Sequence, residues 1–171
     1  RPVRLQWMRA DEHGWDPKGP PTLLDYRATL DAQGHISAWD ADVYLPERPM
    51  RRSGATLLGA VLAGLPRYGS DEGVYDPGLG IPYALPDNRL TARWLVDTPL
   101  PAAWIRAPGR MQNTFGNESF IDEIAAATGA DPFDTRTRYL GDPRGLELME
   151  GLRGFAKWQP RAGRPRDPGE L

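Results

Sequence analysis

The sequence of 171 residues lacks cysteine and contains only two histidines. Without thiols, these residues hold no disulfide bond, no cysteine-ligated zinc or iron–sulfur cluster and no thiol nucleophile. An excess of positive charge is also missing, because 21 Lys and Arg residues stand against 23 Asp and Glu residues. This balance disfavours nucleic acid and anionic membranes as partners. The longest apolar run, Leu57–Leu65, is far shorter than the roughly 20 residues of a membrane-spanning helix.

Glycine and proline are abundant, with 19 and 18 copies that make up about a fifth of the chain. This share lies below the roughly 25–30% that is typical of low-complexity disorder. It therefore predicts a folded domain with many loops. The length alone allows such a domain to bury a hydrophobic core.

Strand patterns gather in the first half of the chain. Apolar and polar residues alternate over Pro2–Arg9, which predicts a half-buried strand, and an exposed loop is expected over Ala10–Pro21. The segments Thr22–Leu30 and His35–Leu45 flank Asp31–Gly34, where glycine supplies the positive φ that hairpin turns need. This arrangement predicts a β-hairpin.

The middle of the chain is less regular. Ser53–Leu65 begins with an N-cap residue and predicts one short helix, although it contains internal glycines. No sustained period runs through Pro66–Asn88, and irregular segments of this length are usually functional or packed against something else. Alternation resumes over Arg89–Val96 and predicts another strand.

Helix patterns dominate the second half. Arg110–Thr128 runs without proline, and prolines at the first helical turn open further helices over Asp131–Leu140 and from Pro143 to about Trp158. Strands in the first half followed by helices in the second predict an α+β fold.

Apolar residues occupy two opposite faces of the long helix at Arg110–Thr128. Met111 and Phe115 fall on one side, whereas Phe120 and Ile124 fall on the other. A helix with this pattern is usually surrounded by protein, and this chain offers limited material to surround it. We therefore expect an exposed apolar patch beside the helix, and a chain that is marginally stable or associated when expressed alone.

Acidic residues near the beginning of the chain give two predictions. Asp40 and Asp42 share one face of the second hairpin strand and are expected to be solvated. One local cluster of potential metal ligands comprises Asp11, Glu12, His13 and Asp16. Because no histidine pair has metal-binding spacing, this cluster is interpreted as a solvated loop.

A second carboxylate pair, Glu118 and Asp122, shares one face of the long helix. Arg106 or Arg110 is the expected cationic partner, and a structural ion pair is favoured over a catalytic carboxylate pair. The triplet that starts at Asn117 matches a glycosylation acceptor but lies inside the predicted helix, so it is interpreted as a chance match.

The turn before the long helix is the best candidate for binding an anion. A short extended piece carrying Arg106 continues through Pro108 and Gly109 into the helix start. Free backbone N–H groups and the helix dipole favour an oxo or phosphate group at such a position. An ordinary structural turn is the alternative.

Two segments carry a family resemblance, residues 98–144, TPLPAAWIRAPGRMQNTFGNESFIDEIAAATGADPFDTRTRYLGDPR, and residues 1–45, RPVRLQWMRADEHGWDPKGPPTLLDYRATLDAQGHISAWDADVYL. They resemble the molybdopterin-binding large subunit of the xanthine dehydrogenase and aldehyde oxidase superfamily. The branch resembled most closely is isoquinoline 1-oxidoreductase, beta subunit. The resemblance implies that residues 1–158 are part of a molybdopterin-binding domain within a larger subunit, and residues 159–171 are expected to be a polar linker or frayed end.

The resemblance also implies an activity and a site. Family members are molybdenum hydroxylases that insert water-derived oxygen into an N-heterocycle or an aldehyde. In the family, an arginine-glycine turn lies beside the molybdenum-pterin cofactor. Arg106 matches the arginine, and Ala107 stands where glycine is usual. The resemblance therefore implies that Arg106, Ala107 and Gly109 contact the cofactor. Pro108 replaces an aromatic residue that would flank the substrate.

The family's glycine-rich pterin contacts and its catalytic Gly-Glu motif have no match in this sequence, so no catalytic residue is assigned. The implied partners are the remainder of the large subunit, an iron–sulfur or other electron-transfer subunit, and a small heterocyclic or aldehyde substrate. The isolated chain is expected to be inactive and to hold no cofactor. The alternative is a catalytically inert binding or assembly module built on the same scaffold. A hydrolase ranks last because the local sequence places neither Ser119 nor Ser70 near a histidine.

Overall fold

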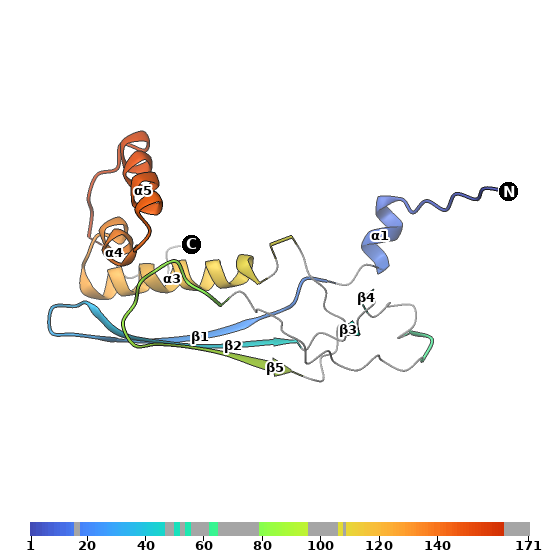
Figure 1. The fold of residues 1–171 in the computed structure, drawn as a ribbon, viewed down its shortest axis with the longest axis horizontal. Helices are drawn as coiled ribbons and strands as arrows, with labels where there is room; N and C mark the ends of the chain where they lie inside the picture. Colours follow the sequence, from blue (N-terminus) through green and yellow to red (C-terminus); the bar gives the residue numbers. More distant parts are fainter. Residues whose placement is uncertain are drawn as a thin grey trace, which may run out of the picture.

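The computed structural model describes residues 1–15, 18–46, 50–51, 54–55, 62–64, 79–95, 106–107 and 109–162. A three-stranded sheet is formed by β1 (Leu23–Leu30), β2 (Ile36–Pro46) and β5 (Asn88–Leu95), in the order β1-β2-β5. Helix α3 (Arg110–Thr128) lies along one face of this sheet (Figure 1). The three strands of the sheet thus precede α3 in the chain, and the predicted α+β fold is confirmed.

The predicted hairpin is confirmed as the antiparallel pair β1 and β2. Its turn is closed by the Asp31 carboxylate, which accepts backbone hydrogen bonds from Gln33 at 2.9 Å and His35 at 2.8 Å. Gly34 has a φ of 78°, a conformation that favours glycine. Strand β5 pairs with β2 in parallel, so the predicted strand at Arg89–Val96 is confirmed with nearly the same bounds.

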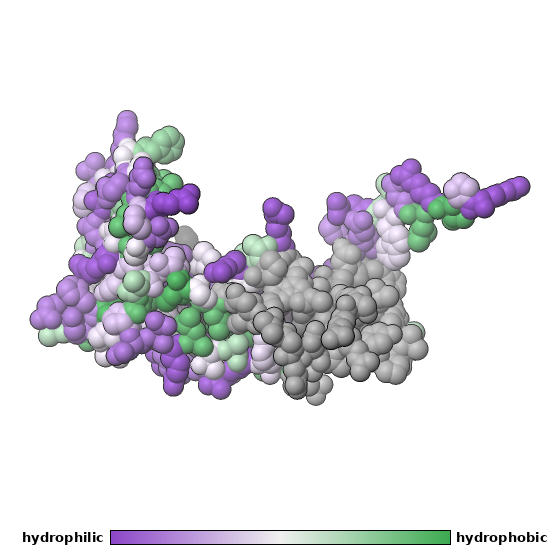
Figure 2. All heavy atoms as spheres, in the orientation of Figure 1, coloured by the Kyte–Doolittle hydropathy of each residue, from purple (hydrophilic) through white to green (hydrophobic). Residues whose placement is uncertain are grey.

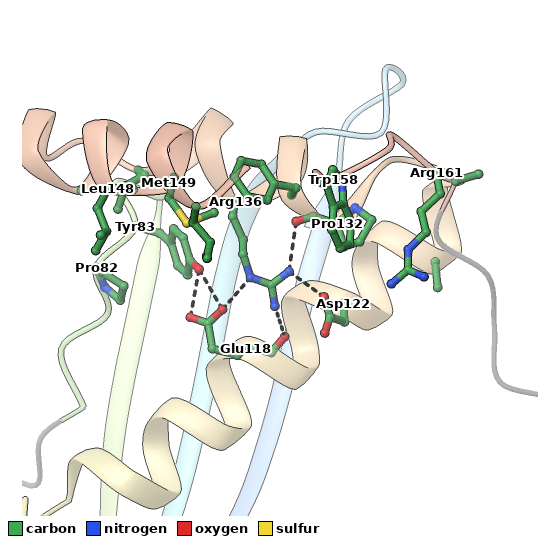
Figure 3. Close-up of a pocket in the computed structure, with 16 residues that line it drawn as sticks. Pro82, Tyr83, Glu118, Asp122, Pro132, Arg136, Leu148, Met149, Trp158 and Arg161 are labelled. Carbon is green, nitrogen blue, oxygen red and sulfur yellow. Dashed lines mark hydrogen bonds and ion pairs between the residues drawn. The ribbon is translucent and has the colours of Figure 1, made fainter. Parts of the chain in front are cut away.

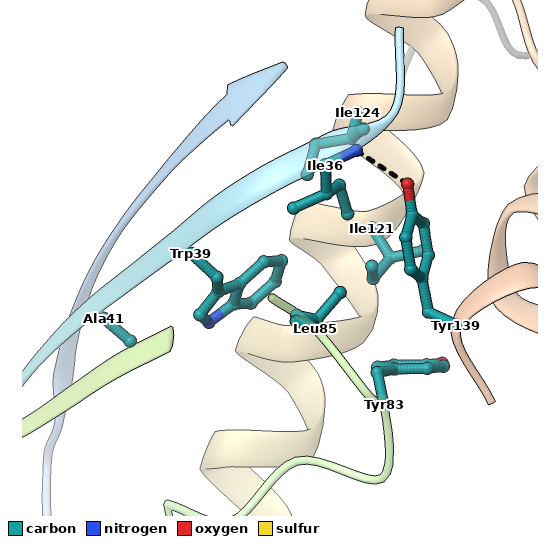
Figure 4. Close-up of a cluster of buried hydrophobic side chains, with 8 residues drawn as sticks. All are labelled: Ile36, Trp39, Ala41, Tyr83, Leu85, Ile121, Ile124 and Tyr139. Atoms are coloured by element: carbon teal, nitrogen blue, oxygen red, sulfur yellow. Dashed lines mark hydrogen bonds between the residues drawn. The ribbon is translucent and has the colours of Figure 1, made fainter. Parts of the chain in front are cut away.

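The hydrophobic core lies between the sheet and α3 (Figure 4). Trp39 is the largest fully buried side chain of this core. The centre of its ring lies 5.0 Å from the ring centre of Phe120 on α3 and 5.6 Å from that of Tyr26 on β1. At one end the backbone N–H of Ile36 donates a 2.6 Å hydrogen bond to the phenol oxygen of Tyr139. The core residues drawn in Figure 4 are Ile36, Trp39, Ala41, Tyr83, Leu85, Ile121, Ile124 and Tyr139.

Gly116 lets α3 approach β1 closely. A Cβ atom at this position would lie 2.6 Å from Cδ1 of Leu24 and 2.7 Å from Cε2 of Tyr26. No real side chain tolerates such contacts without a shift of its neighbours. The glycine therefore fixes how deeply the middle of α3 sits on the sheet.

Two shorter helices follow, α4 (Pro132–Tyr139) and α5 (Pro143–Phe155), as the prolines in the sequence predict. The Asp131 carboxylate caps α4 by accepting hydrogen bonds from Phe133 N at 2.8 Å and Asp134 N at 3.0 Å. Asp142 caps α5 in the same way, with Arg144 N as the donor at 3.1 Å. Both helices lie near the C-terminal end of α3, on the side away from the sheet (Figure 1).

The prediction for the first residues is wrong. Residues 1–8 join no described strand, and α1 (Arg9–Trp15) is a helix where a loop is expected. Alternation makes a strand only when a neighbouring strand completes its backbone hydrogen bonds. Helix α1 begins where the Asp11 carboxylate accepts a 3.1 Å hydrogen bond from Met8 N, which is half of a capping box.

The helix predicted over Ser53–Leu65 lies mostly outside the described residues. Within them, Gly54–Ala55 forms strand β4, which pairs with β3 (Met50–Arg51), so a helix does not begin there. Most of Pro66–Asn88 also lies outside the description. Its last part packs into the core through Tyr83 and Leu85.

The expectation of a solvated carboxylate is wrong for Asp42, whose residue is only 7% exposed, whereas the Asp40 side chain remains partly exposed. Arg93 of β5 holds Asp42 through a 2.8 Å hydrogen bond from Nε to Oδ1. Arg89, which also lies on β5, pairs with Asp40 of β2. The hydrogen bond from Arg89 lowers the pKa of the Asp40 carboxyl. The parallel register of β2 and β5 creates both pairs, which periodicity within one strand does not reveal.

Met111 and Phe115 are exposed on α3, whereas Phe120 and Ile124 pack against the sheet. The predicted exposed apolar surface beside the long helix is thereby confirmed. Among the helices of the described residues, none has the length and apolar character needed to cross a membrane.

Candidate functional site

The turn that precedes α3 has an unusual backbone conformation. Ala107 has a φ of 60° and Gly109 a φ of 72°, so both lie in the left-handed region. The carbonyl of Ala107 accepts a 3.0 Å hydrogen bond from Arg110 N, and the carbonyl of Gly109 accepts one of 3.2 Å from Asn113 N. Left-handed conformations cost a non-glycine residue about 1–2 kcal/mol. This explains in physical terms why glycine suits the position of Ala107.

The start of α3 offers donors to an anion. Gly109 is the N-cap residue, no side chain caps the helix, and the first turn contains no acidic residue. The first N–H groups of a helix have no partner within it and carry the positive end of its dipole. Arg106 is exposed on the same turn. Backbone N–H groups beside a guanidinium are a donor set that fits the oxygens of a phosphate or an oxo ligand.

Arg110 anchors the turn to another part of the chain. Its guanidinium donates a 3.2 Å hydrogen bond to the carbonyl of Gly80. The residues just before Tyr83 therefore lie beside the start of α3, although they are distant in sequence. Arg110 serves this contact and is not the partner of the carboxylates on α3, which corrects the sequence-based expectation.

The cationic partner of Glu118 and Asp122 is Arg136 of α4 (Figure 3). Its Nε lies 2.7 Å from Oε2 of Glu118, and its Nη1 lies 2.6 Å from Oδ1 of Asp122. Further hydrogen bonds reach the carbonyls of Glu118 and Pro132, both at 3.0 Å. Arg106, the other expected partner, is exposed on the turn before α3. Sequence reasoning missed Arg136 because eighteen residues separate it from Glu118, with a helix end between them.

Tyr83 completes this network from the opposite side. Its phenol donates to Glu118, with 2.9 Å to Oε1 and 3.0 Å to Oε2. Burial, followed by the charge of Glu118 and the hydrogen bond to it, raises the pKa of Tyr83 well above its ordinary value. Burial lowers the pKa of Arg136, but the hydrogen bonds and charges of Asp122 and Glu118 outweigh it and raise the net value. Both groups keep their protons, so the network fastens α3 to α4 and to the Tyr83 segment.

A pocket of about 800 Å³ surrounds this network, between α3, α4 and α5. We call it the α5 groove. Its walls are mainly apolar, and its ionic groups are the carboxylates of α3, Arg136 and Arg161. Arg161 lies over the ring of Trp158 at 4.7 Å, and its backbone N–H donates to Asp131 at 2.8 Å. The residues drawn as sticks in Figure 3 line this groove.

Two other sequence motifs form no ligand site in the part of the chain that the structure describes. Across the described residues, no group of three or more His, Cys, Asp or Glu side chains is arranged to hold a metal ion. Asp11 and His13 of the acidic cluster are exposed, and Asp16 lies outside the description. Asn117 is buried within α3, which agrees with a chance match to the glycosylation motif.

Comparison with known proteins gives three matches. Residues 77–140 match the family model of the molybdopterin cofactor-binding domain. A nicotinate dehydrogenase subunit of Pseudomonas putida is 35% identical over 161 residues, which cover 94% of this chain and 13% of that protein. The isoquinoline 1-oxidoreductase beta subunit of Brevundimonas diminuta is 27% identical over 169 residues, which cover 94% of this chain and 20% of that protein. These matches confirm the resemblance to the molybdopterin-binding subunits of the xanthine dehydrogenase and aldehyde oxidase superfamily.

Proposed function

From this family resemblance, we propose that the chain supplies one wall of a molybdenum-pterin pocket in a molybdenum-dependent oxidoreductase. The observation that carries the proposal is the start of α3, where an uncapped helix follows a left-handed turn. This turn lies within residues 77–140, which match the cofactor-binding family. Arg106, Ala107 and Gly109 are the residues that we assign to cofactor binding.

Each part of the turn has a separate task. The Arg110 N–H group already donates within the turn, so the remaining backbone N–H groups of the turn and of the first helical turn donate to anionic oxygens. The Arg106 guanidinium adds a positive charge. Gly116 and Arg136 hold α3 against the sheet and α4, so the donors at its N-terminus keep fixed positions. When bound, the molybdenum cofactor supplies the two-electron oxidation that inserts water-derived oxygen into the substrate. The chain's own contribution is to bind and orient that cofactor.

The substrate class that we propose is a small N-heterocycle or an aldehyde. Heterocycles appear in the names of both relatives, nicotinate in one and isoquinoline in the other. The chain spans 13% and 20% of the length of these relatives. We therefore assign the catalytic residue, the other cofactor contacts and the route for electrons to the remainder of a large subunit and to an electron-transfer partner. One wall alone offers too few contacts to hold a large anionic ligand, so the isolated chain should bind no cofactor.

Substitutions of Ala107 in a complete enzyme that carries this chain test the proposal. Ala107→Pro removes one N–H group and imposes a φ near −65° where the turn has 60°. We expect molybdenum content and hydroxylation rate to fall at least tenfold. Ala107→Gly, the matched control, keeps the N–H group and relieves the left-handed strain, so it should retain both. Arg106→Gln should cause a smaller loss than Ala107→Pro, because the backbone donors remain.

Molybdenum is measured by elemental analysis and folding by thermal unfolding of each variant. An Ala107→Pro enzyme with full molybdenum and full activity contradicts the assignment. A 171-residue chain that alone binds stoichiometric molybdenum and turns over substrate also contradicts it.

A further inference from the structure

Helix α5 exposes an apolar stripe. None of its residues is buried. Leu148, Leu152 and Phe155 are 72%, 49% and 89% exposed, and their spacing places them on one helix face. We call these three residues the α5 stripe. Apolar side chains gather along α5 in the space-filling view (Figure 2).

Another face of α5 is already occupied by α4. Arg153 forms an ion pair with Asp134, and its guanidinium lies 4.4 Å from the ring centre of Phe133. Helical spacing separates Arg153 from the α5 stripe by roughly 100–160° around the axis. The stripe is thus a separate face of α5, which the contact with α4 does not explain.

Leu148 and Leu152 of the α5 stripe line the α5 groove, whereas Phe155 lines a neighbouring hollow together with them. The floor of the α5 groove is one face of α3. Leu148 points from α5 toward Pro82 across the groove (Figure 3). The α3 face that carries Glu118 and Asp122 continues toward the N-terminus with Phe115, which is 72% exposed. One face of α3 is therefore covered by α4 in its second half and left bare in its first half.

The charges of the groove limit what fills it. Glu118 and Asp122 are satisfied by Arg136, so a charged group placed beside these carboxylates would compete with pairs that are already formed. An apolar occupant instead gains burial against Leu148 and Leu152 without disturbing the ion pairs. The three residues of the α5 stripe have the spacing i, i+4 and i+7, and residues with this spacing form a ridge that packs against a second helix.

We propose that the α5 groove receives an amphipathic helix from another part of the same large subunit, with its apolar face on the α5 stripe. This inference rests on the proposed function, because it takes the chain to work within a longer polypeptide. The relatives supply the argument for that occupant, since the chain matches only 13% and 20% of their length.

Cysteine labelling tests the proposal, and the absence of cysteine from this chain makes each new thiol unique within it. Leu148→Cys places a thiol on the α5 stripe, and Glu150→Cys is the matched control on the same helix, at a side chain that is 64% exposed. Both variants are made in a large subunit that carries this chain. Maleimide labelling of each site is followed by peptide mass spectrometry in native buffer and in urea.

We expect Leu148→Cys to react at least tenfold more slowly than Glu150→Cys in native buffer and equally fast in urea. Equal rates in native buffer overturn the proposal. Protection that disappears on dilution points to a second copy of the chain and overturns the assigned occupant. Molybdenum content is measured in parallel, and a protected Leu148→Cys site in a subunit without molybdenum contradicts the proposed function while supporting the occupant of the groove.

Discussion

Gly116→Ala should loosen the contact between α3 and the sheet. The new Cβ would meet Leu24 Cδ1 at 2.6 Å, Tyr26 Cε2 at 2.7 Å and the Tyr26 hydroxyl at 2.9 Å. Ordinary carbon contacts lie at about 3.5–4.0 Å, so the helix or the ring must move by roughly 1 Å. The Tyr26 ring is not free to move, because it packs against Trp39 and Phe120.

Two opposing contributions determine how far Gly116→Ala changes the free energy of unfolding. Alanine favours the helix over glycine by about 1 kcal/mol, whereas overpacking of a filled core costs about 1–3 kcal/mol. The overpacking term prevails, because two neighbouring side chains clash at once. We expect Gly116→Ala to lower the free energy of unfolding by up to about 2 kcal/mol.

Gly151→Ala in α5 is the matched control, because nothing lies within 4 Å of its new Cβ. This variant should gain only the higher helix propensity of alanine, which raises the free energy of unfolding by up to about 1 kcal/mol. Urea unfolding followed by tryptophan fluorescence measures both variants. A Gly116→Ala variant as stable as Gly151→Ala would refute the close approach of α3 to β1.

Three further predictions concern the network and the hairpin. Arg136→Met should lower the free energy of unfolding in urea by about 2–3 kcal/mol, because it removes the guanidinium from a half-buried carboxylate. Asp122→Asn, at a side chain that is 57% exposed, should lower it by less than about 1 kcal/mol. Equal losses for the two variants would contradict the network. Gly34→Ala forces a side chain into a φ of 78° and should cost about 1–2 kcal/mol by the same assay. The lowered pKa of Asp40 means that its ionised form favours folding above its ordinary pKa and that this contribution is lost as the pH falls through the lowered value. Arg89→Gln should raise the pKa of Asp40 toward its ordinary value in an NMR titration, and an unchanged pKa would contradict the pairing.

Local signals account for the parts of the fold that sequence predicts. The turn at Gly34 and the caps at Asp131 and Asp142 depend on residues within four positions of one another. A short stretch of sequence contains all the information that such elements require. The hairpin and the helices α3, α4 and α5 therefore agree closely with their predicted bounds.

Most of the failures involve partners that are distant in sequence, whereas the missed helix α1 begins at a local contact between Met8 and Asp11. Alternation over residues 1–8 indicates a strand, but a strand needs a neighbour that the described chain does not supply. Asp42 is buried because β5 brings Arg93 to it across the parallel register. Arg136 and Tyr83 reach Glu118 from two other segments. Periodicity within one element does not reveal such pairings.

The position of molybdenum in a complete enzyme that carries this chain tests the central claim most directly. X-ray data collected at the molybdenum absorption edge locate the metal by its anomalous scattering, independently of any assumption about its ligands. We predict a single strong peak beside the turn of Arg106, Ala107 and Gly109, in front of the N-terminus of α3. A molybdenum peak on the far side of the subunit, with this turn facing solvent or another protein segment, would contradict the assigned cofactor wall.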